Sequence, residues 1–283
     1  MAFDLHTFIL GVVQGLCEFL PVSSSGHLAL LQNFFGFTQD GLLAFDILLH
    51  CATMLAILIF FRREIGRLLL RWTAGWFSWS ARQTVEWKYG WFILLASALT
   101  ASIGLPLKNT VEKMMGSSLA VGCGLLVTAG LLAIVPLWSG GEDAPTGGQG
   151  LRPREEISLP LKAVIAVGIV QGLAVLPGIS RSGSTIAAGL IMGMAVGEAF
   201  RFSFLVSVPA VLGASLLEAI ELCTDGDLAL PAGWIWAVAA AFVLGWIALK
   251  LMHRLVLSGR WAYFGLYCLF LGSAAILAAL EIF

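Results

Sequence analysis

The sequence predicts an all-α integral membrane protein with six transmembrane helices and two re-entrant helical hairpins, arranged as an inverted-topology repeat. Its composition is the first reason, because 59% of the 283 residues are hydrophobic and 12% are charged, whereas soluble domains carry about 25% charged residues. The second reason is a set of six long apolar segments, and the third is a pair of apolar regions with polar interruptions. A bilayer is the solvent that suits such a chain.

Six apolar segments have the length of about 20 residues that a membrane-crossing helix needs. They cover residues 42–61, 89–107, 119–138, 202–222, 232–252 and 262–282. Two further apolar regions, 5–36 and 161–196, are interrupted at 21–26 (PVSSSG) and 177–183 (PGISRSG). The helical arm over 27–35 would rise only about 13 Å, less than half of the hydrocarbon core. Each interrupted region is therefore predicted to enter and leave on one face, with its tip buried in protein or lining a polar cavity.

Basic residues gather on one side of the six predicted spans. Residues 62–88, 139–162 and 250–260 together hold twelve of them, whereas the opposite loops hold only Lys108 and Lys113. Because lysine and arginine concentrate in cytoplasmic loops, both termini are predicted outside. The net charge of −1, without a basic patch, predicts no nucleic-acid partner.

The chain also repeats itself at an offset of 157 residues. Residues 13–16 (VQGL) recur as 170–173, Gly26 as Gly183, and Phe45 as Phe202. Each half then contains one hairpin and three spans, and an odd number of crossings makes the halves run in opposite directions. Such inverted repeats place their binding site where the broken helices meet, near the midplane.

These matches divide a single membrane domain, residues 1–283, into two repeats. The first repeat is expected over residues 1–138 and the second over 161–283. The cytoplasmic linker between them covers 139–160, whose first residues (SGGEDAPTGGQG) are typical of a flexible loop.

Polar side chains cluster around the first interruption, although polar residues at membrane depth are costly and mark function by default. Gln14 and Glu18 are four residues apart and share a helix face. They are followed by Ser23, Ser24, Ser25 and His27. The next helix would begin here, and a helix N-terminus attracts anions. Ser24 and His27 are three residues apart, close enough for the imidazole to exchange a proton with the seryl oxygen.

The second interruption carries a cation beside several hydroxyl groups. Its polar residues are Ser180, Arg181, Ser182, Ser184 and Thr185. A fixed guanidinium beside hydroxyls and free backbone amides is what a diphosphate requires. The two interruptions together therefore predict one shared phosphate site.

Less specific interpretations stay open for single residues. Serine and threonine in membrane helices often bond the preceding turn, and Arg181 could pair with Glu198. Asp46 and His50, four residues apart at the start of a span, could join the site or face water, and water is favoured.

Three motifs in order resemble the undecaprenyl-diphosphatase (bacitracin-resistance) family along essentially the whole chain. Residues 14–18 (QGLCE) fit its (E/Q)xxxE motif, 19–27 (FLPVSSSGH) resemble its FLPVSS-x-GH segment, and 177–185 (PGISRSGST) fit its PGxSRSxxT motif. Many members have glutamate where this chain has Gln14, so the site has one carboxylate fewer to hold a cation.

The resemblance implies hydrolysis of undecaprenyl diphosphate to undecaprenyl phosphate and inorganic phosphate, which recycles the carrier for cell-wall synthesis and confers bacitracin resistance. It also implies a divalent cation, Mg²⁺ or Ca²⁺, and a multi-pass protein of the bacterial cytoplasmic membrane with its site open to the outer face. The partners implied are a polyprenyl diphosphate and membrane lipids, and a homodimer is left open.

A mechanism follows as a hypothesis. Glu18 and Gln14 hold the cation, and Ser24 is the nucleophile with His27 as proton acceptor and later donor. The substrate-binding groups are Arg181, Ser23, Ser25, Ser180, Ser182, Thr185 and Gln14. A rival chemistry is attack by metal-bound water with His27 as base. A rival function is a polyprenyl-phosphate flippase that uses the same anion site.

Overall fold

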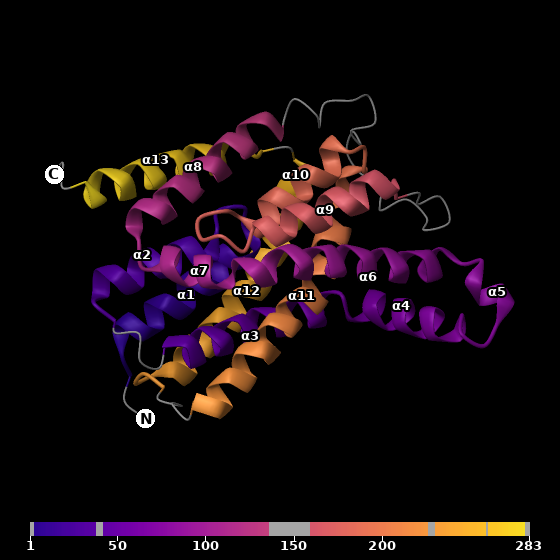
Figure 1. Cartoon of the computed structure of the whole chain (residues 1–283), viewed down its shortest axis with the longest axis horizontal. Coiled ribbons are helices and arrows are strands. Elements are labelled where there is room, and N and C mark those ends of the chain that lie inside the picture. Colours follow the sequence, from indigo (N-terminus) through magenta and orange to yellow (C-terminus); the bar gives the residue numbers. More distant parts are fainter. Residues whose placement is uncertain (1–2, 38–41, 136–158, 226–229, 259, 281–283) are drawn as a thin grey trace.

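The computed structural model describes residues 3–37, 42–135, 159–225, 230–258 and 260–280, and within these ranges it contains helices and no strand (Figure 1). The helices are α1 (Leu5–Phe19), α2 (Ser24–Phe35), α3 (Leu42–Phe60), α4 (Arg62–Ala74), α5 (Trp79–Arg82), α6 (Val85–Gly104), the short 3₁₀ helix η1 (Leu105–Leu107), α7 (Lys108–Met115), α8 (Ser118–Ile134), α9 (Leu161–Leu173), α10 (Arg181–Ile191), α11 (Val196–Asp225), α12 (Trp234–Leu257) and α13 (Ala262–Ala279). The all-α prediction is confirmed for this part of the chain. Of the predicted linker, only residues 159 and 160 lie inside it.

Four or five of the described helical segments are long and apolar enough to cross a membrane. Four of them are Val85–Met115, Val196–Thr224, Trp234–Leu255 and Ala262–Ala279, which overlap four of the six predicted spans. A fifth is formed by α3 only if it is joined to α4, and the two helices meet at an angle of 76°. The remaining predicted span corresponds to α8, an apolar helix of 17 residues.

Both predicted interruptions separate two helices, and each second helix is capped by a serine. The Oγ of Ser23 accepts a hydrogen bond from the backbone N–H of Gly26 at 3.3 Å, and the Oγ of Ser180 accepts one from Gly183 at 3.1 Å. Such caps satisfy a free N–H at the helix start and stabilise it by about 1 kcal/mol. Ser23 has a φ of 68°, a strained conformation that tends to occur at functional sites.

Close helix pairs repeat between the halves of the chain. α1 packs along α12, and α9 packs along α6. A Cβ added to Gly11 would lie 2.2 Å from the carbonyl oxygen of Ala237, and one added to Gly168 would lie 2.7 Å from a carbonyl oxygen of α6. The same approach recurs one turn later at Gly15 and Gly172. Small residues let membrane helices approach this closely, and these glycine pairs have the same offset of 157.

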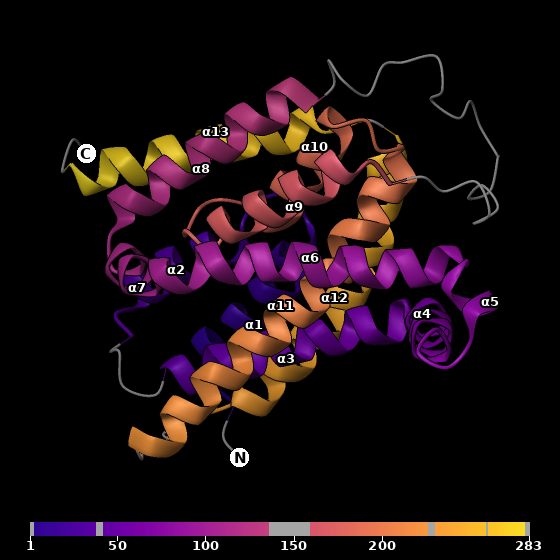
Figure 2. The same ribbon diagram turned by 45° about the vertical axis from the view of Figure 1, so that its right-hand side comes forward.

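The helices after the two interruptions pack against other helices of the bundle (Figures 1 and 2). Every residue of α10 from Ser182 to Leu190 is buried, and α10 packs against α8, α9 and α11. α2 packs against α1 and α8. Protein therefore surrounds the irregular backbone at both interruptions, as its unpaired polar groups require.

Candidate functional site

The tip between α1 and α2 contacts the tip between α9 and α10. A Cβ added to Gly26 would lie 3.0 Å from the Cα of Gly178, so the backbones of the two tips are too close to leave room for a side chain there. The Oγ of Ser182 donates to a backbone carbonyl of the first tip at 3.2 Å. Thr128 of α8 braces the second tip, because its Oγ1 donates to the carbonyl of Gly178 at 2.8 Å and accepts from the N–H of Ser180 at 2.9 Å. The expected meeting of the two interruptions is confirmed.

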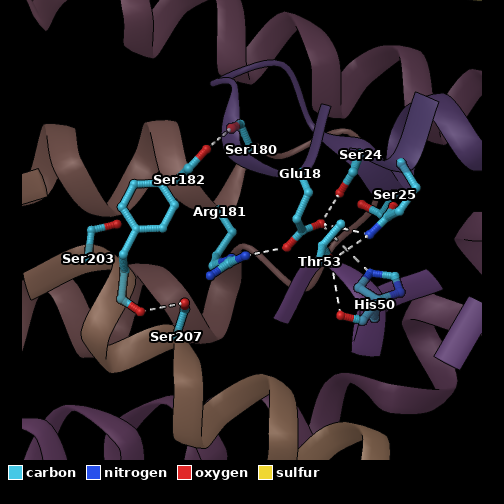
Figure 3. A network of polar contacts seen from close by, with 12 residues as sticks. Glu18, Ser24, Ser25, His50, Thr53, Ser180, Arg181, Ser182, Ser203 and Ser207 are labelled. Carbon is cyan, nitrogen blue, oxygen red and sulfur yellow. Dashed lines mark hydrogen bonds and ion pairs between the residues drawn. The ribbon is translucent and has the colours of Figure 1, made fainter. Parts of the chain in front are cut away.

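Glu18 is at the centre of the polar groups drawn in Figure 3. Arg181, the first residue of α10, donates from Nη2 to Glu18 Oε1 and forms an ion pair with it, although the two residues are 163 positions apart. The Oγ of Ser24 donates to Glu18 Oε2 at 2.6 Å, and Nε2 of Gln14 donates to the same oxygen at 3.2 Å. The side chain of Glu18 is 7% exposed and that of Arg181 is 15% exposed. Burial has largely removed both charges from water, and each side chain neutralises the charge of the other.

α3 contributes two residues to the same cluster. His50 Nε2 lies 3.9 Å from Glu18 Oε2, an ion pair when the imidazole is protonated. Thr53 Oγ1 accepts a long hydrogen bond of 3.5 Å from Gln14 Nε2. We call Gln14, Glu18, Ser24, His50, Thr53 and Arg181 together the Glu18 cluster.

Water was the favoured environment for Asp46 and His50, and His50, whose side chain is 31% exposed, faces water and the site together. His50 lies beside Glu18, whereas the carboxylate of Asp46 accepts two hydrogen bonds from Gln32, at 2.9 and 3.2 Å. Asp46 and His50 lie on the same face of α3, but they are four residues apart along the helix, so each side chain reaches a different neighbour.

The hydrogen bonds of His27 differ from those expected. Its Nδ1 lies 2.7 Å from the carbonyl oxygen of Ser23, and its Nε2 lies 2.7 Å from the hydroxyl of Tyr267. A carbonyl oxygen only accepts, so Nδ1 carries a proton, and in the neutral ring Nε2 accepts from Tyr267. The ring also stacks on Tyr267, with centroids 5.6 Å apart. The expected Ser24–His27 pair is thus not formed: the hydroxyl of Ser24 donates to Glu18, and both ring nitrogens have other partners.

The other predicted binding residues contact protein groups. Ser23 and Ser180 cap helices, and Ser182 links the two tips. The hydroxyls of Ser23 and Ser25 are 3.4 Å apart. Thr185 Oγ1 donates to the carbonyl of Arg181 at 2.7 Å and lies 2.6 Å from the hydroxyl of Ser203. These contacts hold the backbone around Ser24 and Arg181 in place, and hydroxyls can still accept or exchange partners when a ligand binds.

Thr53 and Tyr267 were missed by sequence reasoning. Thr53 lies within an apolar run, and Tyr267 comes 240 residues after His27 on α13. The only local signal is a polar side chain inside an apolar helix, which does not say what the side chain contacts.

Two oxygen groups of the cluster fit a hard divalent cation. Gln14 Oε1 is buried and has no hydrogen-bond partner among the described residues, and the carboxylate of Glu18 lies beside the same side chain. Magnesium sites commonly combine one or two carboxylate or carbonyl oxygens with water and substrate phosphate. In the described part of the chain, no group of three or more His, Cys, Asp or Glu residues is placed to hold a metal.

Comparison with known proteins gives consistent matches over nearly the whole chain. A family model described as Bacitracin resistance protein BacA matches residues 7–274. Undecaprenyl-diphosphatase of Desulfosudis oleivorans is 42% identical over 275 residues, covering 95% of this chain and 96% of that protein. Proteins of the same name from Korarchaeum cryptofilum and Bacteroides thetaiotaomicron are 38% and 37% identical, with 96% and 98% of this chain and 97% and 99% of those proteins covered.

Proposed function

This chain belongs to the bacitracin resistance protein BacA family, and we propose that the Glu18 cluster is where it acts on its lipid substrate. Like its relatives named undecaprenyl-diphosphatase, it is a hydrolase that converts undecaprenyl diphosphate to undecaprenyl phosphate and inorganic phosphate. The reaction returns the lipid carrier to cell-wall synthesis, and resistance to bacitracin fits the family's name.

The observation that carries the proposal is the convergence of Ser24, Glu18 and Arg181 from the two interruptions. Cleavage of a phosphoanhydride depends mainly on positioning and on neutralising the charge of the transferred phosphoryl group. Arg181 uses one nitrogen on Glu18, and its guanidinium has five N–H donors. It can therefore hold a phosphate oxygen while it stays paired with the carboxylate.

In the proposed first step, the Oγ of Ser24 attacks the terminal phosphorus of the diphosphate. A bond forms between Oγ and phosphorus, the bond to the bridging oxygen breaks, and undecaprenyl phosphate leaves. The proton of the hydroxyl passes to Glu18 Oε2, which already accepts its hydrogen bond at 2.6 Å. Glu18 thus takes the role of general base that the sequence analysis gave to His27.

In the proposed second step, the oxygen of a water molecule attacks the phosphorus of the phosphoserine, the bond between phosphorus and Oγ breaks, and the proton held by Glu18 returns to Oγ as inorganic phosphate leaves. His27 lies three residues from Ser24 on α2, and its Nε2, which bonds the hydroxyl of Tyr267 in this structure, takes the proton of the attacking water when that hydroxyl turns away. In the rival chemistry, water attacks the diphosphate directly and no phosphoserine forms.

A divalent cation, Mg²⁺ or Ca²⁺, belongs to the proposal. Gln14 Oε1 and the carboxylate of Glu18 would hold it, and when bound it would neutralise charge on the phosphate oxygens. Gln14 would contribute a neutral oxygen, and Glu18 would contribute a negatively charged one. The hydrogen bond from the Gln14 amide to Thr53 orients that amide. A chelator should therefore reduce hydrolysis reversibly, with activity restored by adding either metal back.

The proposed membrane arrangement has six spans and two re-entrant hairpins in an inverted repeat, in the bacterial cytoplasmic membrane with the site open to the outer face. The glycine-mediated pairs α1–α12 and α9–α6 support the repeat, because the glycines that make the close approach, Gly11 and Gly168, are separated by the same offset of 157 residues. The one-sided distribution of Lys and Arg supports the orientation.

The decisive experiment uses a substrate whose terminal phosphate is radioactive. The substrate is incubated briefly with purified protein in detergent, the reaction is quenched in acid, and the protein is tested for covalently bound label. Covalent label on the protein that is absent from Ser24→Ala supports serine attack, and its absence at every quench time favours water. Ser24→Ala should lower phosphate release at least about 100-fold, whereas Ser102→Ala, at an exposed hydroxyl of α6, should not. Phosphate release without a sealed bilayer also separates an enzyme from a pure flippase.

A further inference from the structure

α4 is a strongly charged helix that departs from the direction of α3. It carries Arg62, Arg63, Glu64, Arg67 and Arg71 within 13 residues, and it turns 76° away from α3. Charged side chains are costly in hydrocarbon, so a helix of this composition lies along the membrane surface. The break at Phe61 therefore marks the level at which α3 reaches that surface.

Tryptophans hold the inner side of α4 against α6. Trp72 stacks on Trp87 with ring centroids 6.1 Å apart and also meets Trp76 and Trp91 edge-on, at 5.9 and 5.8 Å. Figure 2 shows α4 nearly end-on while α6 runs across the view, so the two helices cross. Tryptophan is enriched at the depth of the lipid headgroups, which agrees with the level inferred from the charges.

The outer side of α4 is an arginine-lined depression. Arg62, Arg63, Arg67, Gly66 and Leu70 line it, and all three arginines are exposed. Two of them donate to backbone carbonyls of their own chain segment, Arg62 to residue 59 at 2.9 Å and Arg67 to Arg63 at 3.3 Å. A Cβ at Gly66 would meet no atom within 4 Å, so the glycine leaves an open notch between the guanidinium groups.

We propose that this face of α4 binds the phosphate of an anionic phospholipid, at a second lipid site apart from the Glu18 cluster. Guanidinium groups match phosphate oxygens in charge and geometry. The exposed side chains of Leu69 and Leu70, 55% and 72% exposed, lie beside them and suit the acyl chains. The occupant is a membrane lipid rather than free phosphate, because the exposed Leu69 and Leu70 beside the arginines would contribute nothing to binding an inorganic ion.

The test measures lipid binding to the detergent-solubilised full chain by native mass spectrometry. Phosphatidylglycerol is compared with phosphatidylcholine of identical acyl chains, and inorganic phosphate is offered alone. Each basic residue near a membrane surface contributes about a fivefold change in affinity for anionic lipid. The triple variant Arg62→Gln, Arg63→Gln, Arg67→Gln should therefore weaken phosphatidylglycerol binding by about 100-fold, while hydrolysis of the substrate is retained.

Two controls separate a site from general charge. The variant Lys88→Gln, Lys113→Gln, Lys162→Gln removes three exposed cations elsewhere and should leave the affinity within about threefold. Gly66→Leu places a bulky side chain in the open space between the guanidinium groups without changing charge, and it should weaken binding. Equal loss in both triple variants, no effect of Gly66→Leu, equal binding of phosphatidylcholine, or equally tight binding of inorganic phosphate would each overturn the proposal.

Discussion

Removing the charge of Arg181 should destabilise the protein as well as inactivate it. In Arg181→Gln the carboxylate of Glu18, 7% exposed, keeps the neutral donors Ser24 at 2.6 Å and Gln14 at 3.2 Å, and His50 stays 3.9 Å away. Breaking a buried ion pair by removing one partner costs about 3–5 kcal/mol. Glu18→Gln should cost a similar amount, because it leaves a guanidinium that is 15% exposed without its anion.

The double variant Glu18→Gln, Arg181→Gln should be more stable than either single variant. Two neutral amides replace the ions, and Ser24 and Gln14 can still bond an amide oxygen. We expect a coupling free energy of about 2–3 kcal/mol between the two positions. Hydrolysis should nevertheless stay at least about 100-fold below the parent protein in all three variants, since neither the base nor the phosphate-binding cation returns.

The assay is unfolding in mixed micelles with increasing dodecyl sulfate, followed by circular dichroism, with phosphate release measured on the same samples. The exposed pair Lys108–Glu221, whose side chains are 42% and 48% exposed, is the matched control. Its coupling should stay below about 1 kcal/mol. Additive destabilisation at Glu18 and Arg181, or hydrolysis restored in their double variant, would refute the assigned roles.

Three other outcomes follow from the geometry. Tyr267→Phe keeps the ring that stacks on His27 but removes the hydroxyl at 2.7 Å, so kcat should fall about fivefold with an altered pH profile; an unchanged profile would mean that Tyr267 does not orient the imidazole. Gly11→Ala should destabilise the protein by about 1–3 kcal/mol, because its Cβ would lie 2.2 Å from a backbone oxygen of α12. Gly130→Ala, where the Cβ meets nothing within 4 Å, should not, and equal Tm values would contradict this packing. In intact cells a membrane-impermeant maleimide should label exposed Cys223 but not a cysteine placed in α4, and the reverse pattern would invert the orientation.

Several features could be predicted because their causes are local. The prolines at 21 and 177 cannot continue a helix, and Ser23 and Ser180 cap the helix that follows each of them. The repeat then indicated that the two tips meet, and the structure places Arg181 on Glu18. The exact set of spans was harder to predict, because apolar length alone does not show that the chain bends by 76° after α3.

The sequence by itself determined that the chain is helical, suited to a bilayer and interrupted twice by polar tips, since composition, periodicity and capping act over a few residues. Only the tertiary structure decided that Ser24 donates to Glu18, that His27 turns to Tyr267, and that His50 joins the cluster. These pairings depend on how each helix is rotated and how deep it sits against its neighbours. That information lies in the packing of the whole bundle, because residues 163 or 240 positions apart become neighbours only when it is complete.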